Sequence, residues 1–278
     1  MDDLHIVTVA TESDYYFPYL IDSCKKNGKE LTVLGYGEKW RGFSWRFKLM
    51  IDYLKKLKDT DIVCVIDGYD VVCSRNLFEM KDEFIKLQNK INCKIIISHD
   101  KISTSNFLYF LNKIYNNFYF GKCKNINLNA GTYIGYVKDL LEVLLLIYKN
   151  NDYQDDQQML TKYCNMNNDI YIDIENKLFL TYNKPYSEIS NLTIINNKIV
   201  YNNQHPFFIH APGGTYLEKT LILLGYDVPN NNIQKKIVKR GIKHLNVLVK
   251  KNIFNIILII LLMIVCTKVY KKYVKLLK

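Results

Sequence analysis

Proline and alanine are scarce in this sequence, which has only 5 Pro among 278 residues and neither an internal repeat nor a low-complexity linker. Apolar residues make up 49% of the chain, which is enough to bury a core and argues against global disorder. Asn, Ile, Lys and Tyr are abundant instead, a bias typical of AT-rich genomes such as those of parasites or large DNA viruses. The composition therefore predicts a folded domain but not its chemistry.

The chain also lacks a C-x-x-C pair, although it has seven cysteines. They are dispersed and odd in number, which argues against a zinc site and against a disulfide framework. We expect most of them to be small buried apolar residues in a protein of a reducing compartment. The seven are Cys24, Cys64, Cys73, Cys93, Cys123, Cys164 and Cys266.

Acidic residues are absent from the C-terminal stretch 235–278, which contains twelve Lys or Arg. Since the whole chain has a net charge of +11, residues 1–234 carry −1. An enzyme of nucleic acids more often has its positive charge around the site, so we expect no nucleic-acid partner. A basic segment that flanks an apolar run fits anionic lipid headgroups instead.

The longest apolar run, residues 253–267, is interrupted only by Asn255. As a helix it would span about 22 Å, short of the roughly 30 Å hydrocarbon core, but flanking lysines can extend its reach. We expect a hydrophobic, membrane-associated helix between a basic linker (235–252) and a basic tail (268–278), after a folded domain at 1–234. The alternative is a core helix of a soluble domain.

The first five residues lack the basic and long apolar segments of a signal peptide. We therefore expect a single-pass or tail-anchored protein whose domain at 1–234 is cytosolic. The alternative is a lumenal domain, in which the sequon at Asn191 would be a site for an N-linked glycan.

Short β-rich runs alternate with segments of helical periodicity along residues 1–234, a pattern typical of a layered α/β fold. The runs 61–66 and 94–98 are continuously apolar and predict strands that are buried on both faces. The other predicted strands are 6–10, 31–34, 171–174, 198–201 and 207–210, and the predicted helices are 15–26, 45–57, 77–89, 138–149, 155–164 and 216–224.

The sharpest motif, D-G-Y-D, places Asp67 and Asp70 directly after a predicted buried strand. Ligands of open α/β sheets bind at the carboxyl ends of the strands. Two carboxylates there can coordinate a hard divalent cation, which can neutralise a diphosphate and assist its departure. The alternative is a pair of solvated turn residues or helix caps.

Three weaker motifs follow along the chain. Residues 129–135 hold two glycines that can let a ligand approach the backbone, or that simply open a strand. One residue of the pair Asp155-Asp156 can act as a base or accept a hydrogen bond from a sugar hydroxyl. Alternatively, the two acids merely stabilise a helix N-terminus. His210 can be a metal ligand or a structural group, and Gly213-Gly214 can present N–H groups to phosphate.

Taken in order, the motifs resemble the glycosyltransferase domain of the multifunctional procollagen lysyl hydroxylases and, more distantly, procollagen galactosyltransferases. The resemblance runs from about residue 6 to residue 229. L-G-Y-G-E-K-W (34–40) resembles the family's L-G-x-G-E-x-W, and D-G-Y-D-V (67–71) resembles D-S-Y-D-V. N-A-G-T-Y-I-G (129–135) resembles N-S-G-G-F-I-G, and H-A-P-G-G-T (210–215) resembles H-G-N-G-P-T.

This resemblance implies a GT-A-type, Rossmann-like nucleotide-diphosphosugar transferase with a mixed central sheet. It implies that Asp67, Asp70 and His210 bind Mn²⁺, which would hold the diphosphate of a UDP-sugar. The other implied residues are Trp40, Arg46 or Lys48, Asn129, Gly131, Gln157, Gly213 and Gly214 for the donor, and Asp155 and Asp156 as the catalytic carboxylates.

The resemblance also implies the reaction, which is transfer of glucose or galactose from a UDP-hexose to a hydroxyl. The acceptor implied is hydroxylysine or galactosyl-hydroxylysine of a collagen-like protein, or another protein or glycan. The chain departs from the family at 42–46, where G-F-S-W-R replaces G-G-G-Q-K, and at 153–154, where the family has acids. Two rivals stay open: a membrane-tethered UDP-sugar-binding protein without turnover, and a metal-dependent phosphohydrolase.

Overall fold

The computed structural model of this protein describes residues 3–101, 113–114, 116–149, 154–182, 191–195, 198–213, 215–228, 233–236 and 239. The chain divides into two compact units, Met1–Asn230 and Asn231–Lys278. The second unit is described only at 233–236 and 239, which are helical. The elements discussed below belong to the first unit.

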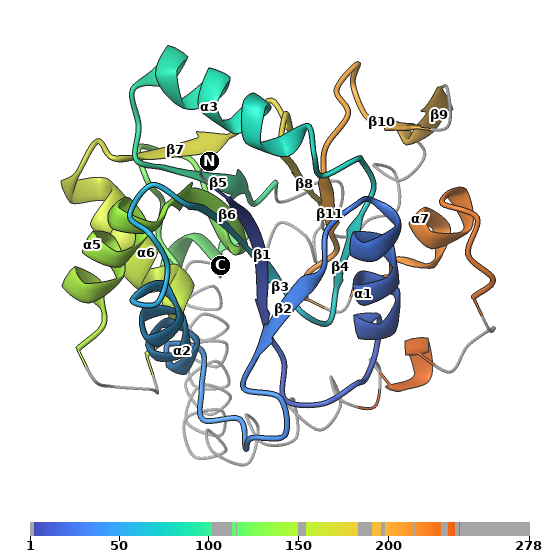
Figure 1. Ribbon diagram of the computed structural model, residues 1–278, viewed down its shortest axis with the longest axis horizontal. Coiled ribbons are helices and arrows are strands. Elements are labelled where there is room, and N and C mark those ends of the chain that lie inside the picture. The colour runs from blue at the N-terminus through green and yellow to red at the C-terminus, as the bar shows by residue number, and fades with distance from the viewer. Residues whose placement is uncertain are drawn as a thin grey trace, which may run out of the picture. The chain divides into compact units, whose positions relative to one another are not determined.

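A six-stranded mixed sheet forms the centre of the first unit (Figure 1). Its strands are β1 (Leu4–Val9), β2 (Leu31–Leu34), β3 (Ile62–Asp67), β5 (Ile95–His99), β6 (Leu128–Tyr136) and β7 (Ile170–Asp173). The order across the sheet is β2-β1-β3-β6-β5-β7, in which β6 alone runs antiparallel to its neighbours. The prediction of an α/β fold with a mixed central sheet is confirmed.

Both faces of this sheet are covered, as the continuous apolar run of β3 predicts. Val63 and Val65 of β3 belong to one apolar cluster, whereas Cys64 and Ile66 belong to another on the opposite face. Three helices contribute to the first cluster: α2 (Trp45–Leu54), α5 (Val137–Ile147) and α6 (Asp156–Met166). Two helices contribute to the second: α1 (Phe17–Lys26) and α3 (Met80–Ile91).

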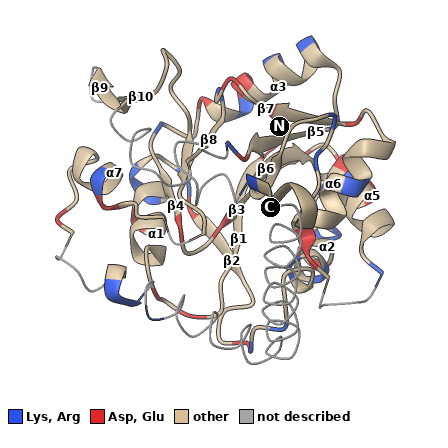
Figure 2. Ribbon diagram, turned by 180° about the vertical axis from the view of Figure 1, so that it is seen from behind, with Lys and Arg blue, Asp and Glu red and all other residues tan. Residues whose placement is uncertain are grey.

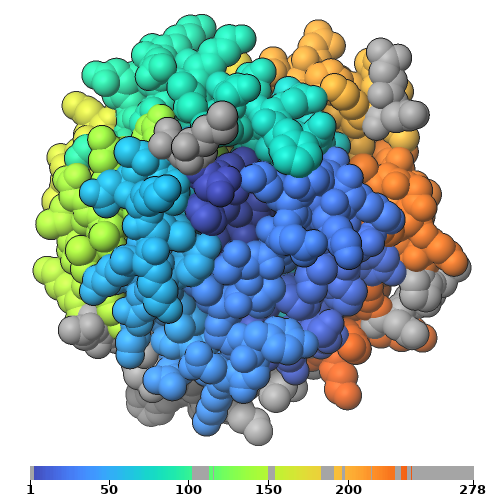
Figure 3. Space-filling model, viewed as in Figure 1, coloured from blue at the N-terminus to red at the C-terminus, as the bar shows by residue number. Residues whose placement is uncertain are grey.

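The outer surface of these helices has charges of both signs (Figure 2) beside exposed apolar side chains such as Leu145 and Leu146 of α5. Figure 2 shows basic and acidic segments side by side on α3, which carries Lys81, Asp82 and Glu83 within its first turn. On the face shown in Figure 3, the dark-blue start of β1 is bordered by teal residues of α3 and by lighter-blue residues of the following segments. The mixture of acidic and basic side chains on α3 agrees with the near-neutral charge of residues 1–234.

A second, smaller sheet lies beside the first and was only partly predicted. It consists of β4 (Val71–Cys73), β11 (Phe208–His210) and β8 (Phe179–Thr181), in the order β4-β11-β8. A separate hairpin joins β9 (Thr193–Ile195) to β10 (Lys198–Val200), and α7 (Glu218–Leu223) follows β11. We did not predict β4, β8 or β9, which have three residues each, although β10 and β11 are equally short and lie within the predicted strands 198–201 and 207–210. β6 of the large sheet was also absent from the predicted strands, because its two glycines are more typical of a turn.

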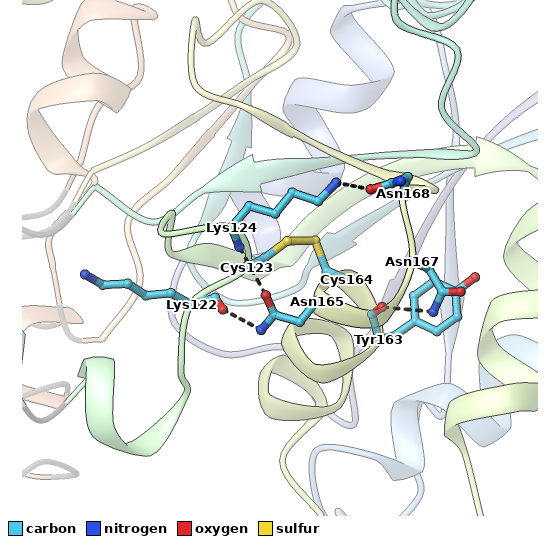
Figure 4. The surroundings of a disulfide bond; sticks show 8 residues. All are labelled: Lys122, Cys123, Lys124, Tyr163, Cys164, Asn165, Asn167 and Asn168. Atoms are coloured by element: carbon cyan, nitrogen blue, oxygen red, sulfur yellow. Dashed lines mark hydrogen bonds between the residues drawn. A yellow bond between two sulfur atoms is a disulfide. The ribbon is translucent and has the colours of Figure 1, made fainter.

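A disulfide joins Cys123 to Cys164, which are separated by 41 residues in the sequence (Figure 4). It ties the segment before β6 to the C-terminal half of α6, beside hydrogen bonds from Asn165 Nδ2 to the Lys122 carbonyl and from the Lys124 N–H to Asn165 Oδ1. The expectation that the cysteines form no disulfide is therefore wrong for this pair, since a single long-range bridge leaves no spacing signal. The described free cysteines, Cys24, Cys64, Cys73 and Cys93, are buried as expected.

Among the residues that the structure describes, no helix is both long and apolar enough to cross a membrane. The predicted hydrophobic helix at 253–267 lies outside the described residues, as do the basic segments next to it apart from 235, 236 and 239. The membrane prediction therefore stays a prediction.

Candidate active site

The candidate site lies where the chain passes from β3 of the large sheet into β4 of the small one. β3 ends at Asp67, and Asp70 directly precedes β4. Because β4 pairs with β11, Val71 lies opposite His210, and the Ala211 N–H donates to the Asp70 carbonyl over 2.9 Å. The pairing of two short strands thus brings together side chains that are far apart in the sequence.

Asp67, Asp70 and His210 form a compact cluster of possible metal ligands. Each offers one ligand atom, and these atoms all lie within 4.8 Å of one another. His210 Nε2 is 3.3 Å from Asp70 Oδ1 and 3.5 Å from Asp67 Oδ2. The imidazole is 1% exposed, and neither of its nitrogens makes a hydrogen bond to the described residues. The imidazole is thus in ion-pair contact with both carboxylates but has no hydrogen bond, which is costly for a buried polar group. A cation bound by all three side chains would satisfy it.

Gly131, on β6, lies directly against this cluster. A Cβ at this position would lie 2.2 Å from His210 Cε1 and 2.6 Å from Asp67 Oδ2, so no larger residue fits without displacing a ligand. The Gly131 N–H donates to Asn129 Oδ1 over 2.8 Å, and Asn129 is 5% exposed. The two residues predicted from the N-A-G-T motif are therefore part of the wall of the cluster.

Arg46, in the first turn of α2, joins the cluster to α6. Its Nη1 donates to Asp67 Oδ1 and its Nη2 donates to Asp156 Oδ2. One guanidinium thus bridges two carboxylates from distant parts of the chain. Lys48, the alternative in the sequence, is exposed on the same helix. The structure brings Arg46 into the site and leaves Lys48 outside it.

The start of α6 places the two predicted catalytic acids differently. Asp155 Oδ1 accepts a hydrogen bond from the Gln158 N–H over 3.0 Å and caps the helix. Asp156 is 4% exposed and pairs with the bridging guanidinium. Gln157 Oε1 accepts a 3.4 Å hydrogen bond from the Ala130 N–H, which ties α6 to β6. Asp156 therefore reaches the acidic cluster, while one oxygen of Asp155 serves the helix terminus.

The charges of the site shift pKa values in opposite directions. Burial raises the pKa of Asp156 to about 6, although Arg46 acts against this shift. Burial also acts to raise the pKa of Asp67, but Arg46 and His210 outweigh it and hold that pKa below its usual value. Burial acts to lower the pKa of His210, yet Asp70 and Asp67 raise it. Asp67 is therefore an anion at neutral pH, the form in which a carboxylate binds a metal.

The loop before α2 carries the aromatic side chain predicted for the nucleotide. Trp40 is 40% exposed and packs edge-on against Phe43, with 5.7 Å between the ring centroids. The Phe43 ring centroid lies 6.0 Å from the guanidinium carbon of Arg46. The Ser44 N–H donates to the Gln154 carbonyl over 3.2 Å, so this loop also contacts the segment that leads into α6. An exposed indole is a surface on which a nucleobase can stack.

The glycines after His210 are only partly described. Gly213 has a φ of +64°, and nothing lies within 4 Å of a Cβ built on it, so glycine serves the backbone conformation there. Gly214 lies outside the described residues.

Asp100 is a buried acid of the site that the sequence analysis missed. It follows β5, is 6% exposed, and joins Asp70 and Asp67 in raising the pKa of His210 against the effect of burial. The signal that could have found it is its position at the carboxyl end of a predicted buried strand.

Residues 1–237 match the family described as the PLOD GT domain. The multifunctional procollagen lysine hydroxylase and glycosyltransferase of Caenorhabditis elegans is 34% identical over 82 residues, which are 26% of this chain and 11% of that protein. The procollagen-lysine,2-oxoglutarate 5-dioxygenase 1 of Gallus gallus is 24% identical over 247 residues, which are 82% of this chain and 32% of that protein. The chain thus spans at most about a third of the length of these curated relatives.

Among solved structures, the galactosyltransferase LgtC in complex with donor and acceptor sugar analogs is similar to this chain. The TM-score is 0.45 and the sequence identity is 15%, over 81% of this chain and 98% of that chain.

Proposed function

Because this chain belongs to the PLOD GT domain family and is a glycosyltransferase, we propose that it moves glucose or galactose from a UDP-sugar to a hydroxyl acceptor. We assign it a GT-A-type fold and a divalent metal, Mn²⁺, held by Asp67, Asp70 and His210. The observation that carries this proposal is the convergence of these three side chains, with all ligand atoms within 4.8 Å of one another.

The residues present fit such an ion. Two carboxylates and one imidazole are donors that Mn²⁺ accepts, and they leave coordination positions for phosphate oxygens. The hydrogen-bond-free nitrogens of buried His210 and the absence of a side chain at Gly131 support a ligand role over a purely structural one. When bound there, a divalent cation neutralises the donor diphosphate and assists its departure as a Lewis acid.

The chain's own side chains bind and orient the substrates. Trp40 offers its exposed indole to the uracil, and the backbone near Gly213 faces the phosphates. Arg46 holds Asp156 at a fixed distance from the metal ligands, so that this buried carboxylate can orient the donor sugar. Asn129, which lies on β6 and accepts from the Gly131 N–H, and Gln157, which accepts from the Ala130 N–H, complete the donor side of the site.

Asp155 and Asp156 are the proposed proton acceptors for the attacking hydroxyl. Burial raises the pKa of both carboxyls, and for Asp156 it does so to about 6, which brings its basicity closer to that needed near neutral pH. In an inverting reaction one of them would take the proton of the acceptor hydroxyl as the new glycosidic bond forms.

The acceptor that we propose is hydroxylysine or galactosyl-hydroxylysine in a collagen-like chain. This part of the proposal rests on the names of the relatives, which refer to procollagen lysine. Other protein or glycan hydroxyls are the alternative.

The first experiment measures UDP release from a panel of UDP-sugars by the full-length protein, with Mn²⁺ or with EDTA. We expect turnover of one UDP-hexose that needs Mn²⁺ and falls at least about 100-fold in the double variant Asp67→Asn/Asp70→Asn. Asp52→Asn, an exposed acid on α2, is the matched control and should keep full activity.

The same assay separates the rivals. Mn²⁺-dependent UDP binding without turnover would favour a binding protein, and release of UMP or phosphate in place of UDP would favour a phosphohydrolase. If folded protein neither binds UDP nor turns over any sugar, the proposed reaction is wrong.

We also propose that residues 253–267 associate with a membrane, on the basis of their apolar sequence between basic segments. The Cys123–Cys164 disulfide favours an oxidising compartment, and thus the lumenal alternative over the cytosolic one. Protease protection of residues 1–234 in intact membranes would support the lumenal placement, and digestion without detergent would support the cytosolic one.

A further inference from the structure

A cavity of about 460 Å³ lies at the end of the large sheet opposite the candidate active site. Thr60, which precedes β3, and Tyr136, which ends β6, both line it, and Ile62 pairs with Tyr136. Asp67 lies at the other end of β3, five residues further on, which corresponds to roughly 17 Å of strand. The cavity is therefore separate from the metal cluster, and its volume is within the range of small-molecule sites.

The last turn of α3 gives this cavity a wall of amides. Gln88, Asn89 and Asn92 all line it. Asn92 ends the helix in the left-handed conformation, with a φ of 58°, which Asn tolerates better than most residues. Each side-chain amide has both a donor and an acceptor of hydrogen bonds. This wall can therefore donate a hydrogen bond to a ligand hydroxyl or accept one from it.

Asp139 adds a buried carboxylate to the same cavity. It lines the cavity in the first turn of α5 and is 8% exposed, and the positive charges of Lys138 and Lys94 act on its carboxyl. The helix dipole accounts for an acid in this turn, but it does not account for its burial. Because it lines the cavity, this carboxylate can accept hydrogen bonds from the hydroxyls of a bound ligand.

The chemistry of this lining selects among ligand classes. A divalent cation would need several carboxylates, and among the described residues only Asp67, Asp70 and His210 form a group that could hold a metal. Lys138 also lines the cavity, and its charge offsets that of Asp139, so the lining has no net charge that would select a phosphate. The amides, these two opposite charges and the Tyr136 ring together suit a neutral ligand with many hydroxyls and an apolar face.

From this arrangement we propose that the cavity between α3 and the start of α5 is a non-catalytic carbohydrate-binding site that holds one neutral hexose unit. The Asp139 carboxylate and the amides of Asn89 and Asn92 bind its hydroxyls, and the Tyr136 ring packs against the sugar. The proposal goes beyond the transfer reaction and does not depend on it, because the two sites share no residue.

The test is binding of methyl β-D-galactopyranoside and methyl α-D-glucopyranoside to the full-length protein, measured by saturation-transfer NMR in the presence of EDTA. We expect saturable binding of at least one glycoside, with a dissociation constant on the order of millimolar. Asn92→Gly removes an amide while keeping the left-handed backbone accessible, and Asp139→Asn removes the charge with little change of shape. Each should weaken binding about tenfold.

Two controls make the result specific. Lys86→Ala, an exposed change on α3, and the double variant Asp67→Asn/Asp70→Asn should both bind as the wild type does. The proposal is overturned if neither glycoside binds, if Asn92→Gly and Asp139→Asn leave binding unchanged, or if the Asp67/Asp70 variant abolishes it.

A further arm identifies the source of the sugar. A galactosyl-hydroxylysine peptide is compared with the same peptide without galactose, again in EDTA. Tighter binding of the glycopeptide than of the free glycoside, lost in Asn92→Gly, would assign the cavity to a sugar carried by a polypeptide. If the glycopeptide binds no more tightly than the free glycoside, the cavity is assigned to free saccharides.

Discussion

Arg46 is the single residue on which the arrangement of the acidic site depends most. Its guanidinium is 18% exposed and pairs with Asp67 on one side and Asp156 on the other. Planar guanidinium groups can hold two carboxylates at once, which a lysine ammonium does not reproduce. Removing Arg46 would leave Asp156 buried without a counter-charge, and it would leave Asp67 with only His210 beside it.

We expect Arg46→Met to lose about 3 kcal/mol of unfolding free energy, because breaking a buried ion pair leaves an uncompensated charge. UDP release should fall about 100-fold, since the start of α6 is then no longer held against the metal cluster. Urea unfolding and the UDP assay measure the two effects. Arg46→Lys should recover part of the stability and little of the activity.

Lys48→Met, on the exposed side of the same helix, is the control. If it impairs UDP release as strongly as Arg46→Met does, the assignment of Arg46 to the site is incorrect.

Much of the site could be predicted at this scale. Asp67, Asp70 and His210 each stand in a motif whose order along the chain resembles a known family, and the structure places all three within one cluster. The contact between Arg46 and Asp156 could not be predicted, because the two are 110 residues apart and no local pattern links them. The helix-capping role of Asp155 was predictable, since Asp at the start of a helix commonly accepts such a hydrogen bond.

Among the elements, β3 is fixed at both ends by aspartates with different tasks. At its start, Asp61 is 6% exposed and accepts hydrogen bonds from the Asp3 N–H over 2.9 Å and the Lys58 N–H over 3.2 Å. Burial acts to raise the pKa of Asp61, but these two N–H groups and His5 outweigh it and leave that pKa below 3.8. The carboxylate thus stabilises the position of β3 beside β1.

We expect Asp61→Asn to cost about 1–2 kcal/mol at pH 7, because the amide replaces one charged acceptor by a donor facing an N–H group. A carboxyl whose pKa is lowered by folding stabilises the protein fully above its ordinary pKa of 3.8, and this contribution is lost as the pH falls through the lower folded value. The difference between wild type and variant should therefore shrink below pH 3.8.

Urea unfolding at several pH values measures this difference. Asp59→Asn, an exposed acid two residues away, should show no such pH-dependent gap. A gap for Asp61→Asn that stays constant down to about pH 2 would contradict the assigned role.

Length alone did not decide which elements were predictable: β6, the longest described strand, was not among the predicted strands because its two glycines are more typical of a turn, whereas the three-residue strands β10 and β11 were predicted. β3 and β5 were found from continuous apolar runs, and α6 was found within two residues of its observed ends. β4 and β8 have three residues each and are defined by pairing with β11 rather than by their own pattern. They matter for function nonetheless, because β4 and β11 bring His210 beside Asp70.

In the molecule as a whole, the Cys123–Cys164 disulfide is the covalent constraint that the sequence analysis did not foresee. It closes a segment of 41 residues that includes β6, α5 and most of α6, and hence Asn129, Gly131 and Asp156. In the chain-entropy account, closing a loop of this length stabilises a fold by about 4 kcal/mol.

We expect the double variant Cys123→Ser/Cys164→Ser to unfold at a lower temperature than the wild type. Dithiothreitol should lower the melting temperature of the wild type towards that of the variant and should leave the variant unchanged. Alkylation of unfolded, unreduced wild type should label two cysteines fewer than alkylation after reduction. Equal labelling would show that the bridge does not form.

The metal cluster also sets a time at which the protein can first become functional during its synthesis. Asp67 and Asp70 leave the ribosome before His210, which belongs to β11 and follows them in the sequence by about half the length of the chain. At a synthesis rate of roughly 5–20 residues per second, the carboxylates precede the imidazole by roughly 7–30 s. During that interval the nascent chain has a half-built ion site, so a chaperone or membrane partner that binds the growing chain acts on a domain that cannot yet hold its metal.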